Sequence, residues 1–287
     1  MIRRGLSWLD DRLGVQAGLR AFLGKPVPVH GRTAFYLLGG AALFLLVLQL
    51  VTGVLLAIYY QPTPEAAHAS VARVMGEVPF GWLVRSLHAR GADLFVVLLL
   101  AHLLSTYWVA AYRPPRELTW VTGCVLFFLA LGFCFSGSLL PWDTLAYFGT
   151  QGGTEEVRTA PVVGELLLRV VRGGEQVGAP TLARFYVAHI ALLPMAILAV
   201  LGVHLALVQR HGMSRPMDDT GTRTVPFFPV VALSDLATWT FLLAAVVTLA
   251  ALHPRELGAP ADPLAAAPAG IRPEWYFTPA YETLRQL

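Results

Sequence analysis

The chain has 287 residues, of which 56% are hydrophobic and only 14% are charged, and its mean hydropathy is +0.60. This composition predicts an integral membrane protein and excludes an ordinary soluble enzyme. The formal net charge of +3 does not call for a nucleic-acid partner, because the arginines gather in short loops and at helix ends, where membrane topology accounts for them.

The N-terminal segment has no apolar core followed by a small-residue cleavage site, so we expect no cleavable signal peptide. Residues 2–23 predict an amphipathic helix on the membrane surface, because leucines recur at roughly helical spacing between charged residues. These are Leu6, Leu9, Leu13, Leu19 and Leu23. The proline-rich stretch from Lys25 to His30 ends this helix, and the first span follows from about Thr33 to Tyr60.

Two of the predicted spans, Arg85–Ala111 and Arg184–Val208, each carry a pair of histidines. The pairs are His88 with His102 and His189 with His204. The first two lie fourteen residues apart, which is about 21 Å along a helix and about 40° around it. The second two lie fifteen residues apart, about 22 Å and about 60°. Each helix therefore offers two imidazoles on one face, at two matched depths.

Histidine is rare in hydrocarbon unless it has a partner, so four histidines in register indicate bound cofactors. The economical interpretation is two stacked b-type haems, each bound axially and without a covalent link. His88 and His189 would bind the iron of one haem, and His102 and His204 the iron of the other. Zinc would need three or four ligands at one level, and each level supplies two. For any single histidine, a packed or hydrogen-bonded role is the alternative.

Glycine pairs repeat the same interval. Gly39 and Gly53 in the first span, and Gly123 and Gly137 in the third span (about Thr119–Leu140), are each fourteen residues apart. Close helix packing is the alternative explanation. The repeated interval predicts a gap without side chains at both haem depths, where a Cβ would otherwise strike the edge of the macrocycle.

The rest of the chain adds connections and one more span. Residues 141–183 leave the bilayer for about forty residues, too long for a bare loop without a function. Weakly helical pieces are expected at Thr144–Gln151 and Val162–Val171. A polar connection, Gln209–Phe228, follows the second histidine helix, and the fifth span is expected at about Ala232–Leu252. Residues 253–287 are too rich in proline for a sixth span.

The distribution of lysine and arginine predicts the orientation. Residues 1–32, 112–118 and 209–230 hold eleven Lys/Arg and five acids, whereas the other three connecting segments hold seven Lys/Arg and eleven acids. By the positive-inside rule, the N-terminus is cytoplasmic and the C-terminus lies on the outer side. Both histidine helices then run inward, so the first histidine of each lies at the outer level and the second at the inner level.

The segment Pro273-Glu274-Trp275-Tyr276 places a carboxylic acid between a proline and two aromatic residues at the membrane surface. Partial burial there favours the protonated acid, which suits a group that accepts and passes on a proton. The alternative is an ordinary interfacial Trp/Tyr anchor with a solvated glutamate.

Together, the histidine pairs, the glycine pairs, Pro141-Trp142 and Pro273-Glu274-Trp275-Tyr276 resemble cytochrome b of the quinol-oxidising cytochrome bc and bf complexes, over about Trp8 to Leu287. The fifteen-residue histidine spacing and the stretches FGWLVRSLH, PRELTWVTG and GAPADPLA are similar to the bf type. In that type, two polypeptides divide at about Pro216. The resemblance therefore implies a di-haem four-helix bundle over 1–216, fused to a partial quinol-site domain over 217–287.

The resemblance implies a quinol-oxidation site on the outer side, where one electron goes to a Rieske iron–sulfur protein and the other to the outer haem. Glu274, Tyr276 and Tyr281 would be its catalytic residues, with Pro141, Trp142, Gly149 and Pro273 completing the site. An inner quinone-reduction site would include Asp235 and Gln209. Arg85 and Arg184 match arginines that meet the outer haem's propionates, with snorkelling at helix ends as the alternative.

Departures from the family limit what is expected. Leu37 stands where the bf type has a cysteine for a covalent haem, so none is expected here, and Ser105 replaces an inner-side arginine. The family's sixth to eighth spans are missing, which indicates truncation, a disordered end or a separate subunit. The resemblance also implies a homodimeric complex with a c-type cytochrome, in the lipid of a bacterial inner membrane.

Two other classes of protein use histidines in membrane helices. A di-haem membrane anchor relays electrons for a dehydrogenase without splitting them, and it explains the histidines but not the long outer loop or the glutamate segment. A transporter with histidines as proton carriers would show acids or broken helices in mid-bilayer. Asp93 and Asp235 are the only acids in the predicted spans, and both lie toward their ends.

Overall fold

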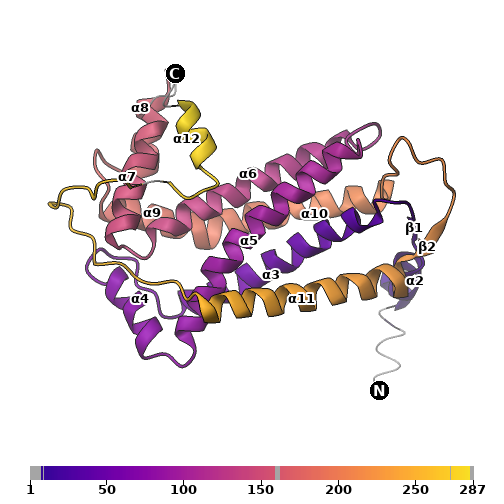
Figure 1. Cartoon of the computed structure of the whole chain (residues 1–287), viewed down its shortest axis with the longest axis horizontal. Coiled ribbons are helices and arrows are strands. Elements are labelled where there is room, and N and C mark those ends of the chain that lie inside the picture. The colour runs from indigo at the N-terminus through magenta and orange to yellow at the C-terminus, as the bar shows by residue number, and fades with distance from the viewer. Residues whose placement is uncertain (1–7, 9, 159–161, 272, 285–287) are drawn as a thin grey trace.

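Five long helices run side by side and define the molecule (Figure 1). The computed structural model describes residues 8, 10–158, 162–271 and 273–284. Within these residues, the helices long and apolar enough to cross a membrane are Thr33–Ala57, Gly81–Trp108, Glu117–Leu139, Ala179–His211 and Phe227–Leu252. The prediction of an all-α membrane protein with five spans is confirmed, with boundaries shifted by a few residues.

The spans pack as two pairs and a fifth helix. Helix α3 (Tyr36–Ala57), which follows the short turn η1 (Thr33–Phe35), packs mainly on α5 (Gly81–Trp108). Helix α6 (Glu117–Leu139) packs mainly on α10 (Leu193–His211), and α11 (Ala232–Leu252) lies against α3 and α5. One buried apolar cluster draws on all five: Ala42, Leu45, Leu46, Phe95, Ala130, Ile197 and Val246.

The second histidine helix contains a π-turn that the sequence analysis did not predict. Helix α9 (Ala179–Val187) continues through η2 (Ala188–Leu192) into α10 without a break. Pro194 explains the turn, because proline lacks the N–H that would bond one turn back and its ring crowds that carbonyl. A π-turn takes up one extra residue. It therefore absorbs the difference between the fifteen-residue and the fourteen-residue histidine spacing.

The end of the bundle that carries the 61–80 and 140–178 connections is called the outer end here. It holds α4 (Ala67–Gly76), α7 (Thr144–Arg158) and α8 (Gly164–Arg172). The two helical pieces predicted in residues 141–183 are confirmed, the first extended by seven residues, whereas α4 was missed. The chain returns to this end after α11 as an irregular segment, described at 253–271 and 273–277, which is followed by α12 (Thr278–Leu284).

Arg172 holds the outer helices together. Its guanidinium is almost fully buried, with 4% of the side chain exposed, and donates to Thr154 Oγ1 at 2.7 Å and to the Gln151 carbonyl at 2.8 Å. It also pairs with Glu155 at 3.1 Å, while the Arg172 carbonyl accepts from Thr181 Oγ1 at 2.7 Å. The side chain and carbonyl of this one residue thus join α7, α8 and the start of α9.

We expect Arg172→Met to destabilise this helical unit by about 2–3 kcal/mol, because buried acceptors on α7 lose their donor. Limited proteolysis of residues 141–183 and a thermal melt measure the loss. Arg169→Met is the matched control: Arg169 pairs with Glu165 at 3.3 Å with 66% of its side chain exposed, a surface pair that contributes little. Equal protease resistance of the two variants would contradict the role given to Arg172.

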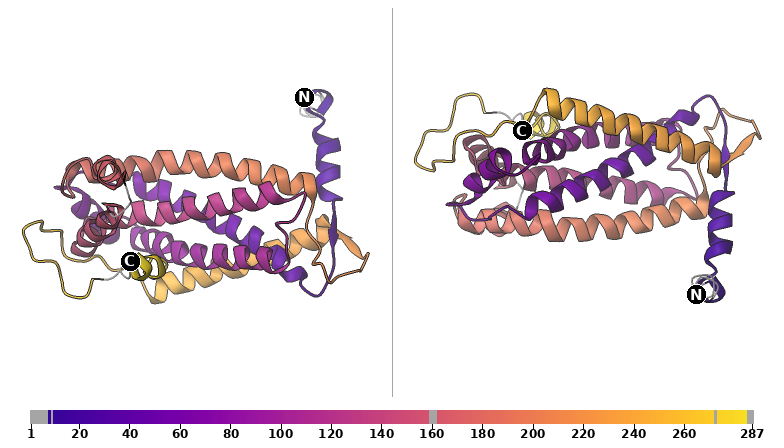
Figure 2. Two further views of the ribbon diagram at one scale, coloured as in Figure 1. Left: turned by 90° about the horizontal axis from the view of Figure 1, so that it is seen from above. Right: turned by 90° about the horizontal axis from the view of Figure 1, so that it is seen from below.

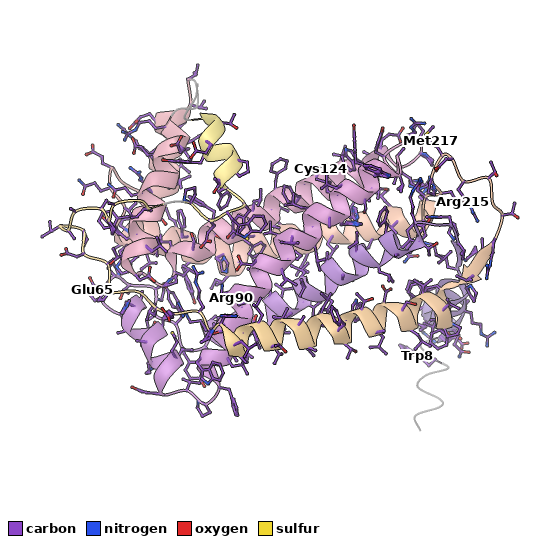
Figure 3. The ribbon with its side chains drawn as sticks, viewed as in Figure 1. Trp8, Glu65, Arg90, Cys124, Arg215 and Met217 are labelled. Carbon is purple, nitrogen blue, oxygen red and sulfur yellow. The ribbon has the colours of Figure 1, made fainter. Side chains whose placement is uncertain are left out.

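The opposite end, called the inner end, carries the N-terminal segment and the connection between α10 and α11. Helix α2 (Val15–Leu23) runs across the bundle axis there (Figure 2), as expected for a helix on the membrane surface. The predicted single helix over 2–23 is wrong in one respect: Gly14 is left-handed, with φ of 59°, and breaks it. Leu6 and Leu9 lie outside the described residues. Figure 3 places Arg215 and Met217 at this end and Glu65 and Arg90 at the other.

A two-stranded ribbon ties the inner connections together. Strand β1 (Pro26–Pro28) pairs antiparallel with β2 (Thr224–Pro226), and the π-turn η3 (Phe227–Val231) leads into α11. The sequence analysis missed this ribbon, since three-residue strands bounded by prolines show no alternation. The ribbon fixes the entry of the first span next to the entry of the fifth.

Candidate functional site

The structure brings the first histidines of the two histidine helices together. The ring centroids of His88 on α5 and His189 in the π-turn are 6.2 Å apart, with their planes at 76°. An imidazole nitrogen binds a transition metal at about 2 Å. Two such bonds plus the two ring radii fill this separation, so the pair fits a single metal ion between the rings. His102 on α5 and His204 on α10 lie near each other at the second level.

Each of the four predicted glycines lies against one of the four imidazoles. A Cβ on Gly53 or Gly39 would lie 3.2 Å from Cε1 of His88 or His102, respectively. On α6, a Cβ on Gly137 would lie 2.7 Å from Cε1 of His189, and one on Gly123 would lie 3.4 Å from Cε1 of His204. The sequence analysis expected these gaps to admit a macrocycle edge. In the structure, the neighbour that fills each gap is the histidine ring itself.

Hydroxyl groups fix the orientation of three of these rings. Nδ1 of His88 lies 2.9 Å from Thr52 Oγ1, whose only proton is donated to the Leu48 carbonyl at 2.7 Å. Oγ1 must therefore accept from Nδ1, which carries the ring proton and leaves Nε2 as a free lone pair. This is the tautomer that binds iron through Nε2, with the second ring nitrogen held by the protein.

The same arrangement recurs on α6. Ser136 Oγ lies 3.1 Å from Nδ1 of His189, and Thr122 Oγ1 lies 3.0 Å from Nδ1 of His204. Each hydroxyl also donates to the carbonyl four residues before it, at 2.8 Å. The sequence analysis missed these residues, although a signal was present: a serine or threonine stands directly before Gly53, Gly123 and Gly137.

His102 departs from this pattern. The residue before Gly39 is Leu38, which has no hydroxyl, and Nδ1 of His102 is buried with no hydrogen-bond partner among the described residues. Its tautomer is therefore not set by the protein. The four rings thus divide into three that are hydrogen-bonded and one that is held by packing alone.

The two predicted propionate arginines occupy helix ends and bond to the chain. Arg85, with 8% of the residue exposed, donates to the carbonyls of Arg255 and Glu256, the latter at 3.2 Å. Arg184 donates to the carbonyls of Arg169, at 3.1 Å, and Val170 at the end of α8. Both arginines therefore fix outer segments, and contact with a cofactor stays a prediction for them.

The segment after α11 crosses the outer end and is held at successive points. The Arg255 N–H donates to Ser86 Oγ at 3.0 Å. Next, the Gly258 N–H donates to Asp143 at 3.2 Å, and the Ala261 N–H donates to the Trp142 carbonyl at 3.1 Å. The Pro141-Trp142 turn is thus joined to the segment that leads to Glu274. Trp142 is buried, with 4% exposed, and has φ of 51°.

Glu274 lies against the bundle rather than in open solvent. Its carboxylate pairs with Arg255 at 3.2 Å, with 35% of the Glu274 side chain exposed. The neighbouring Tyr276 lies near Cys134 on α6, and burial raises the pKa of Tyr276, so the phenol stays protonated. Glu274 is thus partly buried and ion-paired, and its role in proton transfer stays a prediction.

The remaining predicted outer residues are less closely placed. Pro273 is half-buried before Glu274, and Tyr281 is half-buried on α12, where its N–H bonds to the Phe277 carbonyl at 2.9 Å. A Cβ on Gly149 in α7 would meet no atom within 4 Å, so space is open there. The roles of Gly149 and Tyr281 at the outer site therefore stay predictions.

The two predicted inner residues lie at the inner ends of different helices. Gln209 on α10 accepts from Lys25 Nζ at 2.8 Å, and burial lowers the pKa of this lysine. Asp235 on α11 packs on α3, where a Cβ on Gly40 would lie 2.7 Å from its Oδ1. That oxygen is buried without a hydrogen-bond partner among the described residues. An unsatisfied buried oxygen is suited to a ligand that donates a proton.

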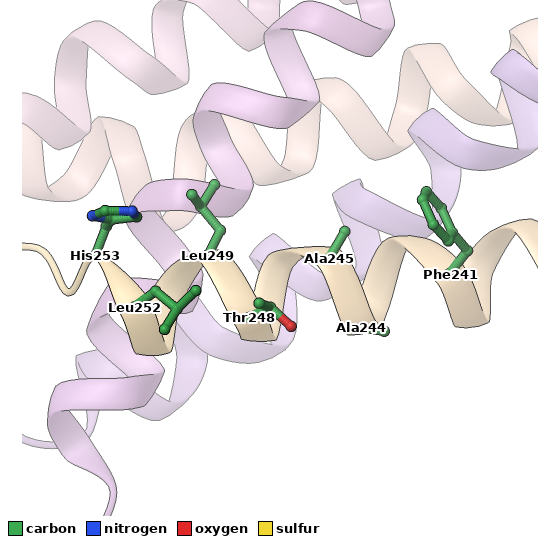
Figure 4. Close-up of a pocket in the computed structure, with 7 residues that line it drawn as sticks. All are labelled: Phe241, Ala244, Ala245, Thr248, Leu249, Leu252 and His253. Carbon is green, nitrogen blue, oxygen red and sulfur yellow. The ribbon is translucent and has the colours of Figure 1, made fainter.

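A hollow on the outside of α11 is not part of this site. Figure 4 shows it lined by one face of the helix: Phe241, Ala244, Ala245, Thr248, Leu249, Leu252 and His253. None of these residues is among those predicted for chemistry. An apolar strip on a membrane span suits lipid or a neighbouring helix.

Fold and site together define an integral membrane protein whose bundle buries two levels of paired histidines. The family described as "Cytochrome b/b6/petB" matches residues 22–212, and "Cytochrome b(C-terminal)/b6/petD" matches residues 260–287. The chain belongs to the cytochrome b family.

Known relatives agree with this assignment. The chain is 43% identical over 284 residues to the "Cytochrome bc complex cytochrome b subunit" of Chlorobaculum thiosulfatiphilum, covering 97% of this chain and 66% of that one. It is 41% identical to "Cytochrome b6" of Heliobacterium modesticaldum, over 74% of this chain and all of the relative. A solved "Hyperthermophilic respiratory Complex III" chain matches with a TM-score of 0.84 and 31% identity, over 98% of this chain and 77% of that one.

Proposed function

We propose that the chain is the cytochrome b subunit of a quinol:cytochrome c oxidoreductase, or of a complex with a plastocyanin-like acceptor. The observation that carries the proposal is the set of glycine–imidazole contacts at two levels, with three rings presenting a free Nε2. When bound, two b-type haems supply reversible one-electron transfer across the membrane. His88 and His189 hold the outer haem, and His102 and His204 hold the inner one.

The contacts of the glycines make a graded prediction for haem binding. Gly137→Ala places a Cβ 2.7 Å from the His189 ring, which cannot move without leaving its position as a ligand. Overpacking of this kind costs about 1–3 kcal/mol, so we expect a clear loss of outer haem. Gly123→Ala places its Cβ at 3.4 Å, an ordinary contact, and should keep the inner haem. The haem-to-protein ratio from reduced-minus-oxidised spectra measures both, and equal haem content in the two variants would contradict the contact argument.

Quinol oxidation belongs to the outer end. Glu274 accepts a quinol proton, Tyr276 and Tyr281 contribute hydroxyl groups, and Pro141, Trp142, Gly149 and Pro273 shape the site. The hydrogen bonds that join residues 255–261 to Ser86 and to Trp142–Thr144 support this grouping. Oxidation at this side releases protons outward.

Quinone reduction belongs to the inner end, beside Asp235 and Gln209. The unpaired oxygen of Asp235 supports a proton-donating ligand there. Protons taken up at the inner side and released at the outer side amount to proton translocation. The orientation rests on the arginine and lysine bias, with the N-terminus cytoplasmic, in a bacterial inner membrane.

The partners follow from membership of a cytochrome bc-type complex. We propose a Rieske iron–sulfur protein, a c-type cytochrome and a homodimeric assembly. The chain spans 66% of the length of its Chlorobaculum relative, so further spans on the same or another polypeptide would complete the outer site. The proposed division into 1–216 and 217–287 falls between the two family matches.

Quinol-dependent cytochrome c reduction by the purified complex tests the proposed function. We expect activity that requires the Rieske protein, together with spectra of two low-spin b haems. A di-haem membrane anchor would show the same spectra but would pass both electrons along one route, without a Rieske requirement. Spectra without b haems would exclude both classes.

A further inference from the structure

Glu274 and Arg255 form an ion pair whose arginine is fixed at its backbone. The Arg255 N–H donates to the buried Ser86 hydroxyl, and its carbonyl accepts from Arg85. Because the main chain of Arg255 is held at both groups, only its guanidinium can move from one partner to another. It now lies 3.2 Å from Glu274, with 38% of the Arg255 side chain exposed.

A second carboxylate, that of Asp93, lies near the same arginine. Asp93 on α5 lies close enough to Glu274 and Arg255 to interact electrostatically with both, and it lies near the Trp275 side chain. Its contact with Arg90, one turn earlier on α5, is loose, at 3.9 Å. Arg90 directs its Nε to the His253 carbonyl at 3.0 Å, so that guanidinium is partly engaged elsewhere.

The groups around this pair come from three elements. Helix α5 supplies Arg85, Arg90 and Asp93, α6 supplies Cys134, and the segment after α11 supplies Arg255, Glu274 and Tyr276. Asp143, after α6, interacts with Arg85 and accepts from the Gly258 N–H. Tyr276 and Cys134 lie near each other. Among these groups, Arg255 pairs directly with Glu274 and interacts electrostatically with Asp93.

We propose that Asp93 is a second carboxylate of the outer site and that Arg255 is shared between it and Glu274. The inference rests on the proposed function, because it concerns the proton that Glu274 takes from quinol. In this step, the quinol O–H bond breaks and an O–H bond forms on Glu274, with no change in oxidation state. Glu274 then no longer attracts Arg255, which turns to Asp93. When Glu274 gives its proton to water, Arg255 returns.

If Arg255 is shared, removing Arg255 and removing Asp93 should shift the acid side of the pH–rate profile in opposite directions. On that side, activity falls as Glu274 becomes protonated. Arg255→Gln removes the charge that favours the carboxylate, so the fall should begin at higher pH. Asp93→Asn removes a competing negative charge and leaves Arg255 to Glu274, so the fall should move to lower pH. We expect shifts of about one pH unit, the lower end of the effect of a neighbouring charge.

The experiment measures quinol-dependent cytochrome c reduction by the purified complex from about pH 5 to 9, after spectra confirm both haems. Arg73→Gln and Glu77→Gln, two exposed residues at the same end, make the same charge changes away from the site. These controls should leave the midpoint of the acid side unchanged, and Arg255→Lys should restore most of the wild-type profile.

The outcomes separate the two proposals. Shifts of opposite sign, larger than those of the controls, support sharing. Shifts in the same direction, or an Asp93→Asn profile equal to that of Glu77→Gln, would overturn it while quinol oxidation itself stands. If the complex does not assemble with Arg255→Gln, the pH–rate profiles of Asp93→Asn and Arg255→Lys still decide whether Arg255 is shared. Absence of quinol oxidation in the wild-type complex would remove both proposals.

Discussion

The His204→Leu variant is expected to lose the inner haem and keep the outer one. The two levels on the continuous helix Ala179–His211 lie about 20 Å apart, so the loss of one ligand does not reach the other pair. His102 cannot replace the lost bond, because Gly39 and the packing of α3 fix its ring on one side of the site. A redox titration of the purified protein should therefore show one b-type component instead of two.

Two further variants test the pairing itself. His102→Leu should give the same spectrum as His204→Leu, whereas His88→Leu and His189→Leu should each remove the other component. His253→Leu is the matched control, since His253 is an exposed histidine at the outer end of α11. If one inner variant lost both haems, the assignment of levels would be refuted. It would also be refuted if the His88→Leu and His204→Leu variants lost the same b-type component.

The Glu274→Gln variant is expected to oxidise quinol at least about tenfold more slowly than the wild type, equivalent to roughly 1.4 kcal/mol in the barrier. A quinol gives up two electrons only as its protons leave, and glutamine keeps the size and hydrogen bonding of glutamate without accepting a proton. Loss of a general base typically costs about 10² to 10⁴ in rate, and alternative water paths soften that figure. The measurement is steady-state quinol oxidation between about pH 6 and 8.

Both haem spectra should be unchanged in Glu274→Gln, because the residue is outside the ligand set. Glu65→Gln, an exposed carboxylate at the outer end, controls for the loss of a negative charge there. If the rate of Glu274→Gln stays within about a factor of two of the wild type across this range, the proton-accepting role is wrong.

The five spans and the depths of the histidine pairs could be predicted from the sequence, because they follow from the length of the apolar segments and from helical periodicity. The fifth span, for example, was predicted as Ala232–Leu252, which are the bounds of α11. The depth match of His189 and His204 was predicted only to about one residue. Its completion depends on a π-turn ahead of Pro194, and whether proline causes a kink, a break or a π-turn is decided by packing.

The contacts that finish the site depend on which helix lies beside which, and periodicity does not give this. The glycine interval indicated a gap, but only the packing of α3 on α5 and α6 on α10 identifies an imidazole as the group that fills it. The Ser/Thr-Gly pairs are visible in the sequence, but their role could not be predicted, because it also depends on which helix lies beside which. Likewise, Arg255 and Asp93 are 162 residues apart and no local pattern relates them.

The arrangement of the bundle as two helix pairs bears on how the protein is made. Each proposed haem takes one ligand from α5 and one from the continuous helix Ala179–His211, and these two helices pack mainly on different partners. Neither pair can retain a haem on its own, and the first to be synthesised must wait in the bilayer for the second. Binding of the proposed haems would then join the two helix pairs of the nascent protein. In a cell short of haem, the unjoined halves would expose their polar rings to membrane proteases, so the amount of this protein would follow the haem supply.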